Sequence, residues 1–325
     1  MKKIFVSFPL IVLIITSCSI NSSFSSFNNV PSSNEESLSS EDISSFYSSS
    51  TQTNSSTSPL DFLPGYSLFW ADEFNGDSLD TNVWEPQIGD GTNYHVYRWG
   101  NNEEQYYKSE NAAVSGGYLH ITAKKEQTSY VTDDNEVRTY QYTSARLRTT
   151  GKITTTYGYV EARIKLPAGT GLWPAFWMLP ENDFAGKWWP TNGEIDIMEA
   201  KGRILNKYGA TIHTGTSNGQ DYYKFKEFTF SSSEGDITSF HDYGVEWTNE
   251  GFNFFIDGQN FFTVTPTQYQ NSNGLYVSSP SAPFDCPFHL LLNLAIGGNY
   301  DGGRSVDESF TQAEMLVDYV RIYHK

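Results

Sequence analysis

The chain has 325 residues, of which 38% are apolar, so it is long enough for one large domain or two small ones. Its formal charge is −17, from 21 basic and 38 acidic residues, which argues against a nucleic-acid partner because phosphate binding needs clustered cations. The same acidity is ordinary for a secreted protein, so the charge says little about the substrate.

The N-terminus has the features of a secretion signal, which we predict over residues 1–18. Basic residues precede an apolar run over 4–16 that is too short to span a bilayer but has the length of a signal-peptide core. The run ends in ITSCS, which resembles the cleavage box of bacterial lipoproteins and predicts Cys18 as the lipidated first residue. We therefore expect an extracellular protein that touches the membrane only through this lipid anchor. The alternative is an ordinary signal peptide with a cysteine nearby.

Residues 19–58 differ in composition from the rest of the chain, because 18 of these 40 residues are serine. Such a stretch buries too little apolar surface to offset the loss of chain entropy, so we predict a flexible tether. A folded domain is then expected over 59–325, and nothing in it calls for more than a monomer. Once Cys18 is lipidated, Cys286 is left alone, which predicts no disulfide framework and a small buried side chain at 286.

The folded part consists of many short segments rich in Tyr, Phe, Val, Ile and Thr, separated by Gly, Asn, Asp and Pro. No long amphipathic helix follows the signal, and no repeat of fixed period indicates a propeller or solenoid. A segment of this length and pattern predicts one all-β domain, a sandwich or jelly roll. The expected strands include 118–123, 157–166, 194–199, 241–247, 252–258, 287–296 and 316–323.

Alternation assigns side chains to the two faces of a strand. Within 157–166, apolar residues alternate with Glu161, Arg163 and Lys165, as expected for a half-buried strand whose charged face meets solvent. The same rule can be applied to 194–199, where the sequence is EIDIME.

Glu199 breaks the alternation of its strand. Glu194 and Asp196 fall on one face, but an offset of five residues turns Glu199 toward the core, where an unpaired carboxylate is very costly. A β-bulge at 197–198 would absorb one residue and return Glu199 to the face of the other two acids. We therefore predict an irregularity at this point.

The three carboxylates on one face suggest glycosidic bond hydrolysis. With one residue absorbed, Glu194 and Glu199 lie about 13 Å apart at Cα, and side chains that lean together bring the carboxyls to roughly 5 to 5.5 Å, the separation in retaining glycosidases. Asp196 lies between them. One Glu would then be the nucleophile and the other the acid and base, kept protonated by mutual repulsion.

Two other interpretations of the carboxylate row stay open. A metal site could use three carboxylates, although no histidine follows at ligand spacing in the sequence. A solvated edge is the commonest outcome of alternating charge. Against both, four tryptophans flank the row, and indole faces beside acids suit sugar rings. They are Trp173, Trp177, Trp188 and Trp189.

Seven segments together resemble glycoside hydrolase family 16, most closely its bacterial laminarinases. They occur in order from about residue 66 to the C-terminus and read WADEFNG, WGNNEEQYY, YTSARLRT, YGYVEARIKLPAGTGLWPAFWMLP, GEIDIMEA, PFHLLLNLAIGGNY and LVDYVRIY. The resemblance implies a concanavalin-like β-jelly roll with a concave cleft that hydrolyses internal β-1,3-glucosidic bonds with retention of configuration. It implies no organic cofactor.

The resemblance also implies roles for single residues. Glu194 matches the nucleophile, Asp196 the residue that assists it, and Glu199 the acid/base. The two residues between Asp196 and Glu199 match the bulged branch of the family. Trp173 and Trp177 match residues that line subsites near the scissile bond.

Further matches fall on polar residues. Asn101 or Asn102, and Arg146, match positions that hydrogen-bond sugar in relatives, and His213 is expected in the cleft, facing the acid/base. Family members often carry a structural calcium ion away from the cleft; here the matching places are Asp318 and the backbone near Glu73. A salt bridge of Asp318 is the alternative.

Other hypotheses keep the fold and change the function. A silent sugar-binding module would usually lack one of the paired acids, and here Glu194 and Glu199 are both present. The same chemistry could act on mixed-linkage β-1,3-1,4-glucan, agarose or carrageenan. Carrageenan is disfavoured because residues 157–200 supply only Arg163, Lys165 and Lys187 as cations. Glu104, where relatives commonly have an apolar residue, leaves the detail of the substrate open.

Overall fold

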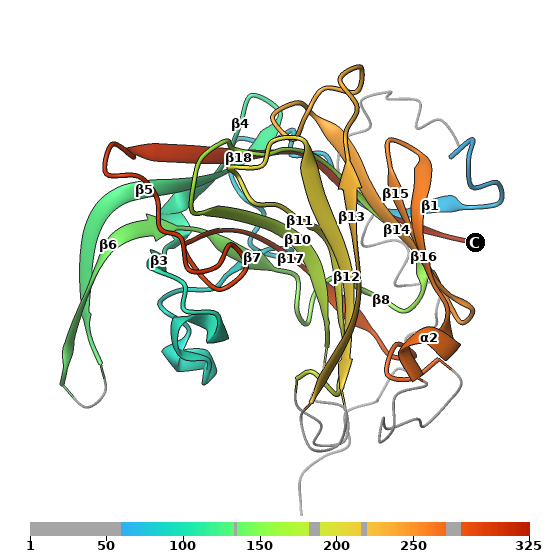
Figure 1. Ribbon diagram of the computed structural model, residues 1–325, viewed down its shortest axis with the longest axis horizontal. Helices are drawn as coiled ribbons and strands as arrows, with labels where there is room; N and C mark the ends of the chain where they lie inside the picture. The colour runs from blue at the N-terminus through green and yellow to red at the C-terminus, as the bar shows by residue number, and fades with distance from the viewer. Residues whose placement is uncertain (1–59, 133–134, 182–188, 216–219, 271–280) are drawn as a thin grey trace, which may run out of the picture. The chain divides into compact units, whose positions relative to one another are not determined.

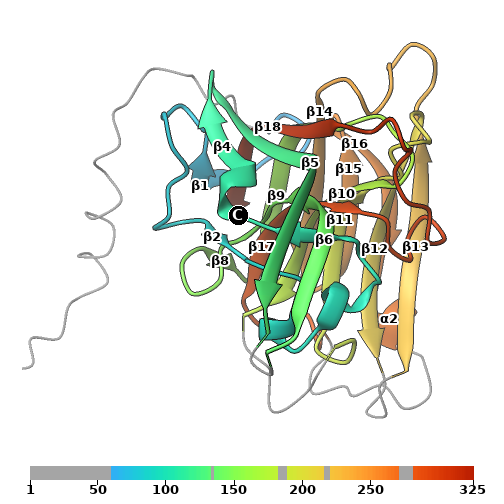
Figure 2. The same cartoon turned by 90° about the vertical axis from the view of Figure 1, so that its left-hand side faces the viewer.

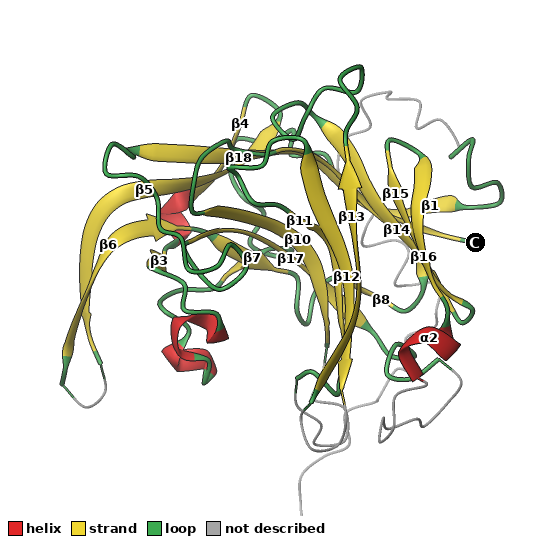
Figure 3. Cartoon of the chain, in the orientation of Figure 1, coloured by secondary structure: helices red, strands yellow, loops and turns green. Residues whose placement is uncertain are grey.

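The computed structural model of the protein describes most of the chain beyond the predicted tether, and the described residues belong to one compact unit. The predicted signal peptide, Cys18, the tether, Lys187 and Trp188 lie outside the described residues. The described residues form two packed sheets, as Figures 1 and 3 show. They are 60–132, 135–181, 189–215, 220–270 and 281–325.

Sheet A has ten strands among the described residues, and only its β3–β6 pair is parallel. Its main path runs β16-β15-β14-β9-β18-β5-β6-β3, with β1 beside β18 and β4 beside β5. Its strands are β1 (Ser67–Asp72), β3 (Gln105–Tyr107), β4 (Ala112–Ser115), β5 (Tyr118–Val131), β6 (Val137–Ser144), β9 (Gly158–Lys165), β14 (His241–Thr248), β15 (Gly251–Ile256), β16 (Gln259–Val264) and β18 (Gln312–His324).

Sheet B has eight described strands, all in antiparallel pairs, and follows the path β13-β12-β11-β10-β17-β7-β2 with β8 beside β17. In Figure 2 its strands lie beside those of sheet A as a second layer. Its strands are β2 (Glu85–Pro86), β7 (Arg146–Arg148), β8 (Thr154–Thr155), β10 (Leu172–Pro180), β11 (Glu194–Glu199), β12 (Lys207–Gly215), β13 (Asp221–Thr229) and β17 (Phe288–Ile296).

Helical structure is sparse in the described part of the chain. It comprises η1 (Thr92–Tyr94), η2 (Tyr97–Gly100), η3 (Ser109–Asn111) and α2 (Pro266–Gln270). No helix among the described residues has the length and apolar character needed to cross a membrane. The predicted all-β jelly-roll sandwich is confirmed, and each expected strand overlaps an observed one.

The core lies between the two sheets and is built by strand alternation. Residues such as Val160, Ile195 and Leu292 are fully buried in one continuous cluster. Strand β17 is buried along its whole length, because it lies in the middle of sheet B between β10 and β7. That position explains its nearly unbroken apolar sequence. Cys286 is buried, as predicted.

One expectation about β9 is wrong. Its alternation is as predicted, but Glu161 on the charged face is only 4% exposed. Tyr66, with Leu60 and Leu63 of the preceding segment, packs in a second small cluster on this side of sheet A, and Tyr323 donates a hydrogen bond to Glu161. The sequence of the strand could not indicate that another segment covers its polar face.

Candidate active site

Strand β11 contains the predicted bulge. Against β12, the three steps from Asp196 to Glu199 are matched by only two steps, from Thr211 to Gly209. The pairing of β11 with β10 shifts by one residue in the same place. Since both neighbours register one extra residue between Asp196 and Glu199, the bulge at Ile197–Met198 is confirmed. Both bulge side chains are buried.

The bulge places Glu194, Asp196 and Glu199 on the face of sheet B that points away from sheet A. We call it the carboxylate face. Residues directly opposite one another on neighbouring strands share a face, so the register extends each acid into a row. The rows are Tyr223–His213–Glu194, then Phe225–Thr211–Asp196–Trp177–Leu291–Arg148, and then Glu227–Gly209–Glu199–Ala175–Asn293–Arg146.

Two indole N–H groups hold the outer acids. Trp173 Nε1 donates to Glu199 Oε1 over 3.0 Å, and Trp189 Nε1 donates to Glu194 Oε2 over 2.6 Å. Trp173 also stacks on Tyr300 at 5.1 Å between ring centroids. Each bond fixes one oxygen of its carboxyl group and so holds that group in place.

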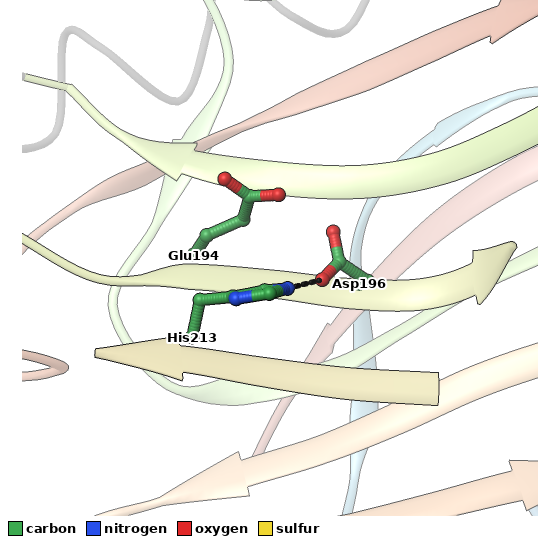
Figure 4. Close-up of side chains that lie close together, drawn as sticks. All are labelled: Glu194, Asp196 and His213. Carbon is green, nitrogen blue, oxygen red and sulfur yellow. Dashed lines mark ion pairs between the residues drawn. The ribbon is translucent and has the colours of Figure 1, made fainter. Parts of the chain in front are cut away.

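His213 lies beside Asp196, as Figure 4 shows. Its Nε2 is 3.4 Å from Asp196 Oδ2, and its Nδ1 is 3.1 Å from Asp221 Oδ2. The expectation that His213 faces Glu199 is therefore wrong, because β12 pairs His213 with Glu194, two rows away from Glu199. Burial alone would lower the pKa of His213, but the hydrogen bond with Asp221 and the charge of Glu194 outweigh it and raise that pKa.

The acids differ in how readily they ionise. Burial and the charge of Glu194 raise the pKa of the Glu199 carboxyl to about 7, while the hydrogen bond from Trp173 acts in the opposite direction. Burial, followed by the charges of Glu194 and Glu199, raises the pKa of Asp196 well above its ordinary value. Burial and the neighbouring carboxylates therefore both favour the protonated form of Asp196, which lies between the two glutamates.

Trp177 and Arg146 form a second group on this face. The Arg146 guanidinium lies between the rings of Trp99 and Trp177, 4.5 and 4.6 Å from their centroids, and its Nε donates to Gln87. Trp177 Nε1 donates to Asn293 Oδ1 over 2.8 Å. Arg146 and Trp177 therefore share the carboxylate face with the acids, as expected of residues near a substrate.

The predicted asparagines bond to the segment that lies against Trp173. Asn102 Nδ2 donates to Asn299 Oδ1 over 2.9 Å, and the Asn101 carbonyl accepts from the Asn299 backbone N–H over 2.8 Å. A Cβ at Gly298 would lie 3.0 Å from the Trp173 ring, so the segment with Gly298 and Asn299 lies directly against that indole. Asn102 thus uses its amide within the protein.

The sequence suggested a metal at two places, and only one of them has side chains placed to hold it. Ligand atoms of Glu194, Asp196 and His213 all lie within 4.8 Å of one another, so the histidine that the sequence spacing did not reveal is supplied by β12. At the predicted calcium position, Arg321 takes both carboxylate oxygens of Glu73, and Arg163 lies 3.3 Å from Asp318.

The side chains at the calcium position do not fit a cation as they lie, since each carboxylate faces a guanidinium. The alternative for Asp318, a salt bridge, is what the structure has. Calcium binding through backbone oxygens near Glu73 stays a prediction.

Several residues of this face were missed by the sequence reasoning. Arg148 shares the row of Asp196 and adds a cation that a count over 157–200 overlooked, whereas Arg163 lies in sheet A and pairs with Asp242. Asp221 and Tyr300 also escaped notice. Strand register would have found Arg148 and Asp221, but register is a property of the folded chain and not of any one segment.

Comparisons with known proteins agree with this geometry. The family description "GH16_PorA-D: Beta-porphyranase A-D, GH16 domain" matches residues 69–325. "Glucan endo-1,3-beta-glucosidase A1" of Niallia circulans is 40% identical over 271 residues, covering 80% of this chain but only 38% of that protein. "Beta-glucanase" of Rhodothermus marinus is 38% identical over 279 residues, covering 81% of this chain and 87% of that protein. The laminarinase catalytic domain of Thermotoga maritima MSB8 aligns with a TM-score of 0.70 at 36% identity, over 80% of this chain and 98% of that chain.

Proposed function

Because the chain belongs to glycoside hydrolase family 16, we propose that it hydrolyses internal β-1,3-glucosidic bonds of laminarin-type glucans with retention of configuration. One observation carries the proposal: the bulge in β11 puts Glu194 and Glu199 on one face, each with one oxygen held by an indole N–H. The named relatives are glucanases and a laminarinase, which supports a β-glucan as the substrate.

In the first step, Glu194 attacks the anomeric carbon and forms a glycosyl ester. Trp189 holds Oε2, so Oε1 is the attacking atom. Glu199, with its pKa raised to about 7, gives its proton to the departing glycosidic oxygen as the bond to the anomeric carbon breaks. Asp196, whose pKa is raised by burial and by the charge of Glu194, lies beside the attacking carboxylate and assists it.

In the second step, the Glu199 carboxylate takes a proton from a water molecule, whose oxygen attacks the anomeric carbon. The ester bond breaks, the Glu194 carboxylate is released, and the sugar regains its original configuration. Glu199 ends protonated, ready for the next bond. The chemistry needs no organic cofactor.

We further propose that the enzyme works outside the cell as a monomeric lipoprotein. Cys18 would carry the lipid, and residues 19–58 would link it to the catalytic domain. A flexible linker of this length spans roughly 35 Å on average, so released oligosaccharides stay close to the cell surface. Labelling with a radioactive fatty acid, lost in Cys18→Ser, tests the anchor.

Digestion of a glycan panel tests the activity. The panel comprises laminarin, lichenan, agarose, carrageenan and porphyran, the last because of the family description that matches. We expect cleavage of laminarin, with the β-anomer appearing first in the NMR spectrum and lichenan as a side substrate. Initial release of the α-anomer would contradict the double displacement. Laminarin left intact while a galactan is cut would assign the same chemistry to another glycan.

A further inference from the structure

An exposed aromatic strip extends the carboxylate face beyond the acids. Tyr223 and Phe225 lie on β13, the edge strand of sheet B, with 60% and 45% of their surface exposed. An exposed aromatic ring beside a sugar site offers a face on which the apolar side of a sugar ring can pack. The position of these two rings next to the acids therefore points to substrate binding.

Register places both rings on the same face as the acids. Tyr223 lies opposite His213, which lies opposite Glu194. Phe225 lies opposite Thr211, which lies opposite Asp196. The alternate side chains of β13 point to the other side, where Phe228 packs against the core.

Aromatic contacts connect Tyr223 of the strip to Glu194. From Glu194, the path runs through Trp189 to His213 at 5.9 Å between ring centroids, and from His213 to Tyr223 at 5.8 Å. Trp189 is itself 51% exposed. This path leads from the proposed nucleophile to the edge of the sheet without a break.

A second path starts at Glu199. Trp173 donates to Glu199 and stacks on Tyr300. Beside Tyr300, a Cβ on Gly209 would collide with the Phe225 ring and lie 3.0 Å from the Tyr300 hydroxyl. The missing side chain at Gly209 thus leaves the space that the Phe225 ring occupies over β12.

We propose that Tyr223 and Phe225 form a binding subsite for glucosyl units of the β-glucan that lie away from the scissile bond. The inference rests on the proposed function and says where the glucan chain lies beyond the scissile bond. Strand β13 is two strands from β11, about 10 Å, so the sugar there is not the one attacked. Apolar faces of glucosyl rings pack on aromatic rings, whereas the acids near the scissile bond meet hydroxyls and the glycosidic oxygen. The subsite lies on the opposite side of β11 from Trp177 and Arg146, so the chain spans both.

The test compares long and short substrates with the variant Tyr223→Ala/Phe225→Ala. We expect kcat/KM on laminarin to fall roughly 5- to 20-fold, and on a short aryl β-laminaribioside less than about twofold. The single variant Tyr223→Trp keeps an aromatic face at this position. It should therefore retain most of the wild-type kcat/KM on laminarin. Phe69→Ala is the matched control, since Phe69 is 57% exposed on β1 of the other sheet and should leave both values unchanged.

Each result decides between the two proposals. A selective loss on laminarin, with an unchanged unfolding midpoint, supports the subsite. If the double variant loses the same factor in kcat/KM on laminarin as on the short substrate, or loses nothing on either, the subsite is overturned. The glucanase proposal then still stands. A wild-type protein that cleaves no β-1,3-glucan overturns the proposed function and the assignment of this strip to glucan.

Discussion

Trp173 donates its indole N–H to Glu199 Oε1 over 3.0 Å, and this bond favours the ionised form of the carboxyl. A hydrogen bond to an ionised group is worth roughly 1.5–3 kcal/mol. Trp173 therefore opposes the burial that raises the pKa of Glu199, and the balance between the two sets the pH at which the acid loses its proton.

Trp173→Phe should move the alkaline limb of the kcat/KM profile to higher pH. Without the N–H, the charged form of Glu199 loses its stabilising partner, so the carboxyl keeps its proton to higher pH. The profile is measured with laminarin from about pH 4 to 9, a range that brackets the raised pKa. Trp177→Phe is the control, because the Trp177 N–H goes to Asn293. An unmoved limb in Trp173→Phe would show that Glu199 does not govern it.

Glu199→Gln should reduce activity according to the leaving group. Natural glucan needs a proton on its departing oxygen, so we expect a loss of about 10³-fold or more, in line with general acid catalysis. An activated aryl leaving group needs little protonation, so formation of the glycosyl ester should be far less affected. Pre-steady-state release of the aryl group measures this step. The same loss for every leaving group would exclude the acid role.

Glu194→Gln should abolish turnover on all substrates without unfolding the protein. The substitution keeps the volume and removes the nucleophile, and the expected loss is about 10⁴-fold or more. Circular dichroism and the unfolding midpoint confirm the fold, and laminarin binding should persist. Glu250→Gln, on an exposed carboxylate remote from the acids in sequence, is the matched control. Substantial activity in folded Glu194→Gln would withdraw the mechanism.

The bulge could be predicted because its evidence is local. A carboxylate five residues after Glu194, in a strand whose apolar residues alternate, has no acceptable position unless one residue is absorbed. The strands themselves follow from the same alternation. The resemblance then supplied roles for Glu194 and Glu199 that alternation alone could not assign.

The surroundings of the acids could not be read in this way. His213 lies beside Asp196 and not Glu199, because the register of β12 is fixed by pairing with both neighbouring strands. Burial of Glu161 depends on a segment almost a hundred residues earlier in the chain. Both are consequences of contacts between distant segments, which composition and periodicity of a single strand do not contain.

The raised pKa of Glu199 also predicts how stability depends on pH. In the unfolded chain this carboxyl has the ordinary glutamate pKa of 4.5, against about 7 in the folded protein. Between these two pKa values the folded state binds more protons than the unfolded chain. The contribution of Glu199 to the free energy of unfolding is therefore complete below pH 4.5 and is lost as pH rises through 7. Glu199→Gln removes this loss. The free energy of unfolding of the variant, relative to that of wild type, should therefore rise by up to roughly 3 kcal/mol between about pH 4 and pH 8. Urea unfolding at the two pH values measures the difference, with Glu250→Gln as the control. A difference between Glu199→Gln and wild type that does not change with pH would mean that Glu199 ionises as readily in the folded protein as in the unfolded chain.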